Sequence, residues 1–102
     1  MLFEKSRFSA NDVVTLKLIS GEEVLGKFIS EDMMSISLSR VLMIAMTAKG
    51  PAMAPILMTV DPDKDLTFQK SAVSIITSSD SEIAAQYTTQ TTGIAIPKGG
   101  II

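Results

Sequence analysis

The stretch that decides the fold is residues 13–32, which read VVTLKLISGEEVLGKFISED. Apolar and polar side chains alternate over residues 13–19, and this period of two predicts a β-strand. Ser20-Gly21 is suited to a tight turn, after which residues 22–30 alternate again and predict a second, antiparallel strand. The residues on the expected inner faces are Val14, Leu16 and Leu18, followed by Val24, Gly26 and Phe28.

A glycine, Gly26, lies in the middle of the second predicted strand. Such a glycine weakens a strand unless the chain bends sharply there or another backbone comes close. Small closed barrels contain bends of this kind. A third strand is predicted at residues 34–39, where Met, Ile and Leu alternate with serines. We therefore expect an all-β fold, a small and strongly bent five-stranded antiparallel barrel with a C-terminal helix.

The alternation is lost further along the chain, because residues 41–46 and 55–58 carry apolar side chains on both faces. Residues 48–54, AKGPAMA, are expected to connect these two strands. A barrel of this size buries only one face, so the outward apolar side chains need cover. We expect other copies of this chain to provide it, since obligate interfaces resemble a core cut in half. Cover by the chain's own C-terminal helix is the alternative. The candidate interface residues are Val41, Met43, Ile44, Ile56, Met58, Val73 and Ile75.

The last part of the chain is predicted to contain short strands at residues 66–70 and 73–77, followed by a helix over about residues 80–91. Ser79 and Glu82 are spaced as a capping box, which predicts Ser79 as the N-cap. A short extended piece and a mobile tail are expected after the helix. The buried stripe of the helix is expected to comprise Ile83, Ala84, Tyr87 and Thr91.

The composition excludes most familiar catalytic sites. The 102 residues include no cysteine and no histidine, so thiol and imidazole nucleophiles and Cys/His metal cages are absent. No pattern brings two carboxylates together for acid–base chemistry. The net charge is −2, and the basic residues are scattered, unlike the basic stripe of duplex-binding proteins. We expect one non-enzymatic domain over residues 1–102, with no cofactor, in which residues 12–78 approximately form the barrel and residues 79–102 the helix and tail.

Residues 61–65, DPDKD, invite interpretation as a calcium site, because aspartates supply hard oxygen ligands. A calcium-binding helix–loop–helix that starts at Asp61 would need glycine and glutamate where Leu66 and Ala72 stand. The run is therefore predicted to be a polar turn, and no metal site is predicted.

Two short segments carry a family resemblance. Residues 20–32 resemble the first motif of the Sm and Sm-like (LSm/Hfq-like) RNA-associated proteins, since Gly21, Gly26 and Asp32 keep that family's spacing. Residues 70–74, KSAVS, are similar to the lysine-containing form of the second motif. The longer middle of the chain, its Asp-rich turn and its C-terminal helix resemble the small Sm-like proteins of tailed marine phages.

The resemblance implies a homo-oligomeric ring of about five to seven subunits whose edge strands pair with their neighbours. It implies contact with single-stranded RNA at the central pore. It also implies a location in the host cytoplasm or in a virion, and the longest apolar run, residues 41–46, is too short to cross a membrane. The alternative function is that of a phage structural or adaptor component, which binds a phage or host protein and no nucleic acid.

The departures from the family pattern weaken the expected RNA contact. Ile36 stands where Sm proteins have a base-contacting asparagine, and methionines replace the aromatic platform. The residues alone also favour simpler roles: Asp32 as a turn aspartate that binds its own backbone, and Lys70 as a solvated lysine at a strand end. Met34 has the parity of an inward-facing residue. The RNA-binding candidates are Asp32, Met33, Met34, Lys70 and Ser71.

Overall fold

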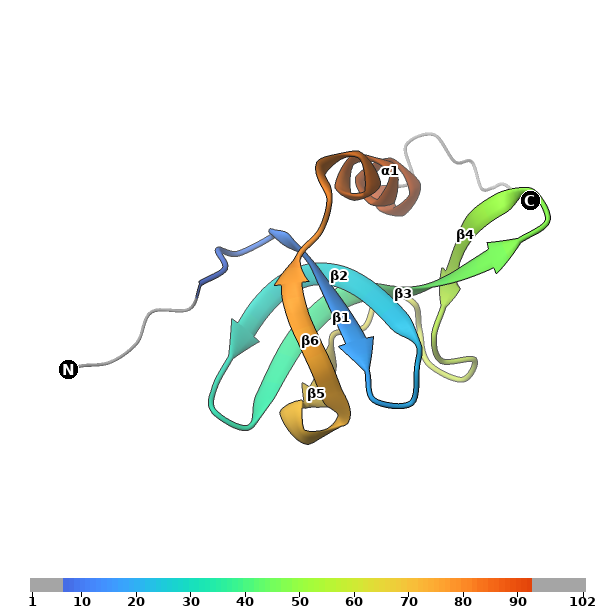
Figure 1. The fold of residues 1–102 in the computed structure, drawn as a ribbon. Helices are drawn as coiled ribbons and strands as arrows, with labels where there is room; N and C mark the ends of the chain where they lie inside the picture. The colour runs from blue at the N-terminus through green and yellow to red at the C-terminus, as the bar shows by residue number, and fades with distance from the viewer. Residues whose placement is uncertain (1–6, 93–102) are drawn as a thin grey trace.

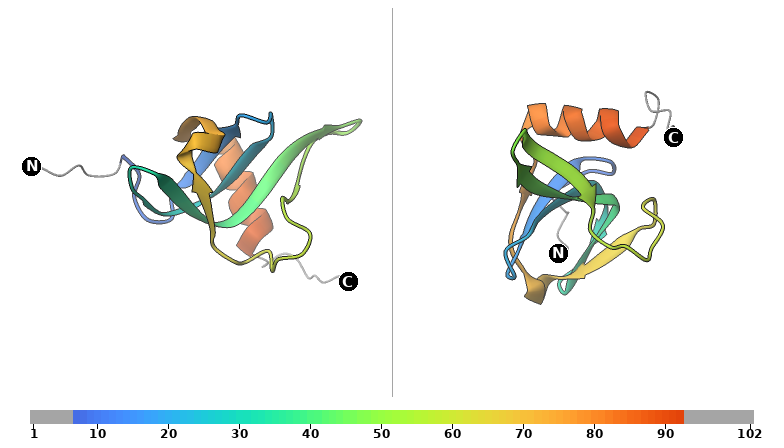
Figure 2. Two further views of the ribbon diagram at one scale, coloured as in Figure 1. Left: turned by 90° about the horizontal axis from the view of Figure 1, so that it is seen from below. Right: turned by 90° about the vertical axis from the view of Figure 1, so that its right-hand side faces the viewer.

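The structure, a computed structural model, describes residues 7–92. Within this range the chain forms a six-stranded antiparallel sheet with an α-helix at its C-terminal end, and the helix lies across one side of the bent sheet (Figures 1 and 2). The strands run in the order β4-β3-β2-β1-β6, and β5 pairs with β3. The elements are β1 (Val13–Leu18), β2 (Glu23–Glu31), β3 (Ser35–Thr47), β4 (Gly50–Pro55), β5 (Leu66–Gln69), the 3-10 helix η1 (Lys70–Ala72), β6 (Val73–Ser78) and α1 (Ser81–Thr92).

The mostly-β fold agrees with the sequence prediction, but the strand count does not. The stretches 34–39 and 41–46 belong to one 13-residue strand, β3. This strand is long enough to pair with β2 along one edge, and with β5 and then β4 along the other. The sheet is therefore open, with β5 and β6 consecutive in the chain but unpaired with each other in the part that the structure describes.

The predicted strand at residues 55–58 is wrong, because the hairpin after β3 closes earlier. Thr47 and Gly50 face each other across a two-residue turn, Gly50 has a φ of 109°, and the Thr47 hydroxyl donates to the Gly50 carbonyl at 2.6 Å. The expected connection 48–54 thus contains the turn and most of β4. Two prolines, Pro51 and Pro55, stand in this strand.

The close approach of β2 and β3 explains why Gly26 lies in mid-strand. A Cβ added at Gly26 would lie 2.9 Å from the Ser39 carbonyl oxygen and 3.2 Å from Val41 Cγ2. At this point the register shifts, so that Gly26 stands opposite the two residues Arg40 and Val41. Arg40, the extra residue of this β-bulge, has a φ of 51°, in the left-handed region. The bend predicted from the sequence is therefore a β-bulge in β3, and it fits only because the facing residue of β2, Gly26, has no side chain.

The main core lies inside the curved sheet. Its buried residues come from the alternating faces predicted for the first two strands, together with β3. Partly buried side chains from β5, β6 and the loop after β4 complete it. The buried residues of this core are Val14, Leu16, Val24, Phe28, Ile36, Leu38 and Val41.

The helix α1 covers the outer face of the two-faced region of β3. Tyr87 is fully buried and forms a second cluster with Leu25 and Leu42, and Ile44 and Ile83 pack against this cluster. Ile44 is therefore partly covered within the chain itself, in line with the alternative in which the chain's own helix covers this face, and cover of the remaining surface by other copies stays a prediction. The expected stripe of the helix is confirmed as well, since its members are buried or partly buried.

Two side chains, those of Tyr87 and Arg40, join the helix to the bulge. Tyr87 Oη donates toward the carbonyls of Arg40, at 2.7 Å, and Ser39, at 3.2 Å. Arg40 Nη1 in turn donates to the Thr91 carbonyl at 2.8 Å. The pairing register of β3 with β2 shifts here, and the Tyr87 hydroxyl gives the carbonyls beside the shift a hydrogen-bond partner from α1.

The N-cap of α1 differs by one residue from the prediction. Asp80 Oδ2 accepts the backbone N–H groups of Glu82, at 3.0 Å, and Ile83, at 3.4 Å. Ser79 is instead tied to β1, where its hydroxyl lies 2.7 Å from the Thr15 hydroxyl. Asp80 therefore caps α1 in place of Ser79, because the Ser79 hydroxyl is bonded to β1. The expected piece after the helix lies outside the described residues.

Gly26→Ala tests the requirement for close approach of the strands. The added methyl group would meet backbone rather than a flexible side chain, so we expect a loss of about 1–3 kcal/mol in the free energy of unfolding, measured with urea. Ser30→Ala, at an exposed position of the same strand, should change it by no more than about 0.5 kcal/mol. Equal stabilities of the two variants would show that β2 and β3 can separate at no cost.

The pH dependence of unfolding tests the Tyr87 contact. Burial raises the pKa of Tyr87 from 10.0 to about 12, against the opposing effect of the Arg40 guanidinium. Because the folded-state pKa is the higher one, the stabilisation is complete below pH 10 and is lost as pH rises toward 12. Over that window the wild type should lose about 2–3 kcal/mol more than Tyr87→Phe in urea unfolding. Parallel losses would mean that the phenol ionises equally well in the folded state.

Candidate functional site

The turn between β2 and β3 is held by the carboxylate of Asp32. Its Oδ1 accepts the backbone N–H groups of Met34, at 2.8 Å, and Ser35, at 2.9 Å. The Asp32 N–H donates to the Ser35 carbonyl at 2.9 Å. These bonds from Met34 and Ser35 lower the pKa of Asp32, because they favour the charged carboxylate. Asp32 therefore orders its own turn, which is the simpler role that the residues favoured.

The start of η1 meets this turn. The Lys70 N–H donates to the Met34 carbonyl at 2.8 Å, and Lys70 Nζ lies 3.3 Å from Glu31 Oε1. The charge of Lys70 also contributes to the lowered pKa of Asp32. Two segments that are almost forty residues apart in the sequence thus form one corner at an end of the sheet. We call residues 31–34 and 70–71 the Lys70 corner.

Four of the five predicted RNA-binding residues are exposed on the Lys70 corner. Met33 and Met34 are 89% and 70% exposed, and Asp32 and Ser71 are exposed as well. The inward orientation expected for Met34 is wrong, because the Asp32 turn delays the start of β3 to Ser35. All five candidates therefore lie close together, and both thioethers are available to a ligand.

The charge of the Lys70 corner is mixed. One ammonium, Lys70, stands with two carboxylates, Glu31 and Asp32. The Lys70 and Glu31 side chains are 29% and 11% exposed, so their ion pair is partly shielded from solvent. A phosphate that approaches Lys70 must compete with Glu31 for the ammonium. The corner can thus offer one cation and an apolar thioether surface to a ligand.

The candidate interface residues lie in three environments. Val41 belongs to the main core and is 3% exposed, which removes it from the surface. Ile44 is partly buried in the cluster around Tyr87. Met43, Ile56 and Val73 are partly buried against the main core. Met58 and Ile75 are 94% and 55% exposed and remain open to a partner.

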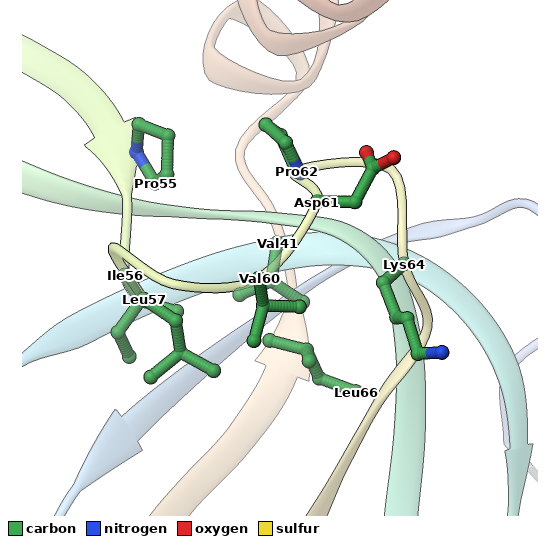
Figure 3. Close-up of a pocket in the computed structure, with 9 residues that line it drawn as sticks. All are labelled: Val41, Pro55, Ile56, Leu57, Val60, Asp61, Pro62, Lys64 and Leu66. Carbon is green, nitrogen blue, oxygen red and sulfur yellow. The ribbon is translucent and has the colours of Figure 1, made fainter.

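The Asp-rich run is a turn, as predicted. Asp61 Oδ1 accepts the Asp63 N–H at 2.9 Å, and the Lys64 N–H donates to the Asp61 carbonyl at 3.0 Å. Figure 3 shows this loop over a pocket of only about 10 Å³, which has room for about one water. Among residues 7–92, no three or more acidic side chains gather as a metal site.

A larger pocket escaped the sequence analysis. It has a volume of about 380 Å³ and lies between the C-terminal turn of α1, the β3–β4 hairpin and the turn at residues 61–65. One sequence signal pointed to it, since Arg40 places a charge at the start of the two-faced stretch. Its lining residues are Arg40, Leu42, Met53, Pro55, Pro62, Asp63, Gln90 and Thr91.

Comparison with known proteins does not place this chain in a family. No model of a protein family matches it, and no curated protein matches it either. Within the described residues, no helix is long and apolar enough to cross a membrane.

Proposed function

We propose that this chain is a non-enzymatic protein of the Sm-like type, which assembles into a homomeric ring and binds single-stranded RNA weakly at the Lys70 corner. The observation that carries the proposal is the contact between the β2–β3 turn and η1. Of the two segments that resemble the family's motifs, residues 20–32 end two residues before this contact and residues 70–74 begin at it, since the Lys70 N–H donates to the Met34 carbonyl at 2.8 Å. The strongly bent barrel of that family belongs to the same proposal, and in it β5 and β6 stay unpaired with each other within one copy, so that their edges face neighbouring copies.

Unpaired strand edges support the ring. Within residues 7–92, β6 pairs only with β1 and β5 only with β3, so each strand has one open edge. Ile75 lies on β6 and is 55% exposed, which gives this edge strand one exposed apolar side chain. An open strand edge favours pairing with another chain. Pairing of β6 of one copy with β5 of the next is a head-to-tail contact, which forms a closed ring when the rotation between copies is suitable.

The surface of the Lys70 corner supports the RNA contact. The Met33 and Met34 side chains can lie against bases, and the Lys70 ammonium can hold one phosphate. A thioether surface stabilises a base less than an aromatic platform does, and Glu31 competes for the ammonium. Both features make the proposed binding weak and salt-dependent.

The mixed charge of the corner favours a second candidate. Two exposed methionines beside Glu31 and Asp32 form a surface suited to an apolar, basic protein segment. In this alternative the ring is a phage structural or adaptor component, and its partner is a phage or host protein.

Ile75→Asp tests the assembly. The residue is half exposed on an edge strand, so the charge should disturb the monomer little and repel a neighbouring strand strongly. We expect light scattering to show a ring for the wild type and a monomer for Ile75→Asp, with unchanged β circular dichroism. Met46→Asp is the matched control, because Met46 is 78% exposed but lies on the β3–β4 hairpin. A monomeric wild type at micromolar concentration would contradict the ring.

Lys70→Ala tests the RNA contact. We expect fluorescence anisotropy with a short U-rich RNA to show binding at low salt, about fivefold weaker in the variant and with a salt slope reduced by about one. Lys49→Ala is the control, since Lys49 lies in the turn at the other end of β3 and is exposed. An absence of binding by the wild type at low salt would refute the RNA proposal and leave the protein-binding candidate.

A further inference from the structure

The larger pocket contains a guanidinium on a strained backbone. Arg40 keeps its left-handed φ of 51° at the bulge, although such backbone conformations cost energy for any residue with a side chain. Its side chain is 38% exposed. Nη1 is fixed by the Thr91 carbonyl at 2.8 Å, in the last turn of α1. The sheet bulge and the helix together hold this cation at the pocket wall.

The size and walls of the pocket suit a small organic ligand. The volume of about 380 Å³ falls within the range of about 300–1,000 Å³ that is common for ligand sites. Apolar walls with a few polar groups are typical of such sites. Here the apolar walls are Leu42, Met53, Pro55 and Pro62, and the polar groups belong to Arg40, Asp63, Gln90 and Thr91.

The partner of Arg40 in the pocket indicates the chemistry of the ligand. Asp63 Oδ1 lies 3.5 Å from Arg40 Nε, and the Asp63 side chain is 72% exposed. A single long contact to a solvated carboxylate is a weak ion pair. A guanidinium binds a carboxylate best through two parallel N–H bonds in one plane. The Asp63 carboxylate is therefore a partner of the right chemical kind for the Arg40 guanidinium, but it makes only one long contact instead of two parallel hydrogen bonds.

We propose that this pocket binds a small carboxylate with an apolar body. The carboxylate pairs with Arg40 in place of Asp63, and the apolar body lies against Leu42, Met53 and the two prolines. The pocket shares no residue with the Lys70 corner, so the inference is independent of the proposed RNA binding.

Titration of the full-length protein with sodium octanoate tests the proposal. Calorimetry measures the affinity, and amide chemical shifts locate the site. We expect a dissociation constant of about 1 mM or lower, with shifts concentrated at Leu42, Met53, Gln90 and Thr91. Acetate has the carboxylate without the body, and 1-octanol has the body without the carboxylate, so each should bind at least about tenfold more weakly.

Two variants distinguish the effect of charge on octanoate binding from an effect on the fold. Asp63→Asn removes the competing carboxylate from an exposed turn and should strengthen octanoate binding about threefold or more. Asp65→Asn is its control, because Asp65 is an exposed aspartate of the same loop that does not line the pocket. Arg40→Asn removes the cation while asparagine tolerates the left-handed backbone, and it should weaken binding at least about tenfold.

The proposal is supported if octanoate shifts the named amides, if Asp63→Asn binds octanoate more tightly than the wild type, and if Asp65→Asn binds it with the wild-type affinity. An absence of binding to the wild type, shifts at other amides, or equal affinities of wild type and Asp63→Asn would overturn it. Because Arg40→Asn also removes the contact to Thr91, the comparison of wild type with Asp63→Asn decides the proposal, since the Asp63 side chain is largely in solvent.

Discussion

The close approach of β2 and β3 at Gly26 is the constraint on which the rest of the structure depends. The missing side chain lets the Ser39 carbonyl come within 2.9 Å of where a Cβ would lie. This proximity accommodates the bulge at Arg40, where the ladder is interrupted. The hydroxyl of Tyr87 binds the carbonyls at the bulge and so fixes the position of α1. One absent methyl group thus determines both how the sheet bends and where the helix docks.

The sequence predicted those parts of the fold that depend on local alternation. The inner faces of β1 and β2, the helix stripe and the turn at Asp61 were all correct because each rests on neighbouring residues. The β3–β4 hairpin was misplaced, because apolar residues on both faces give no period from which to choose a register. The cover of β3 was assigned to other copies because the position of Tyr87 over Leu42 is a tertiary contact without a local signal.

In the candidate site, too, the features set by neighbouring residues could be predicted and the tertiary contacts could not. The role of Asp32 in its own turn follows from a local rule, and the structure has those bonds. The meeting of Lys70 with Met34 depends on the pairing of β5 with β3, which no short pattern in the sequence specifies. The sequence resemblance pointed to both segments. The ion pair between Glu31 and Lys70, in which the Glu31 carboxylate competes with a phosphate for the ammonium, became visible only in three dimensions. The Arg40 pocket joins three remote segments and left only one unexplained charge as a signal.

The two prolines of β4 limit how these molecules can aggregate. Proline has no N–H, and within sheets it is found where that missing donor faces away from the ladder. The outer side of β4 therefore lacks two donors, at Pro51 and Pro55, that an incoming strand would require. The apolar β3–β4 hairpin is for this reason a poor template for fibril growth, although Met46 at its end is exposed.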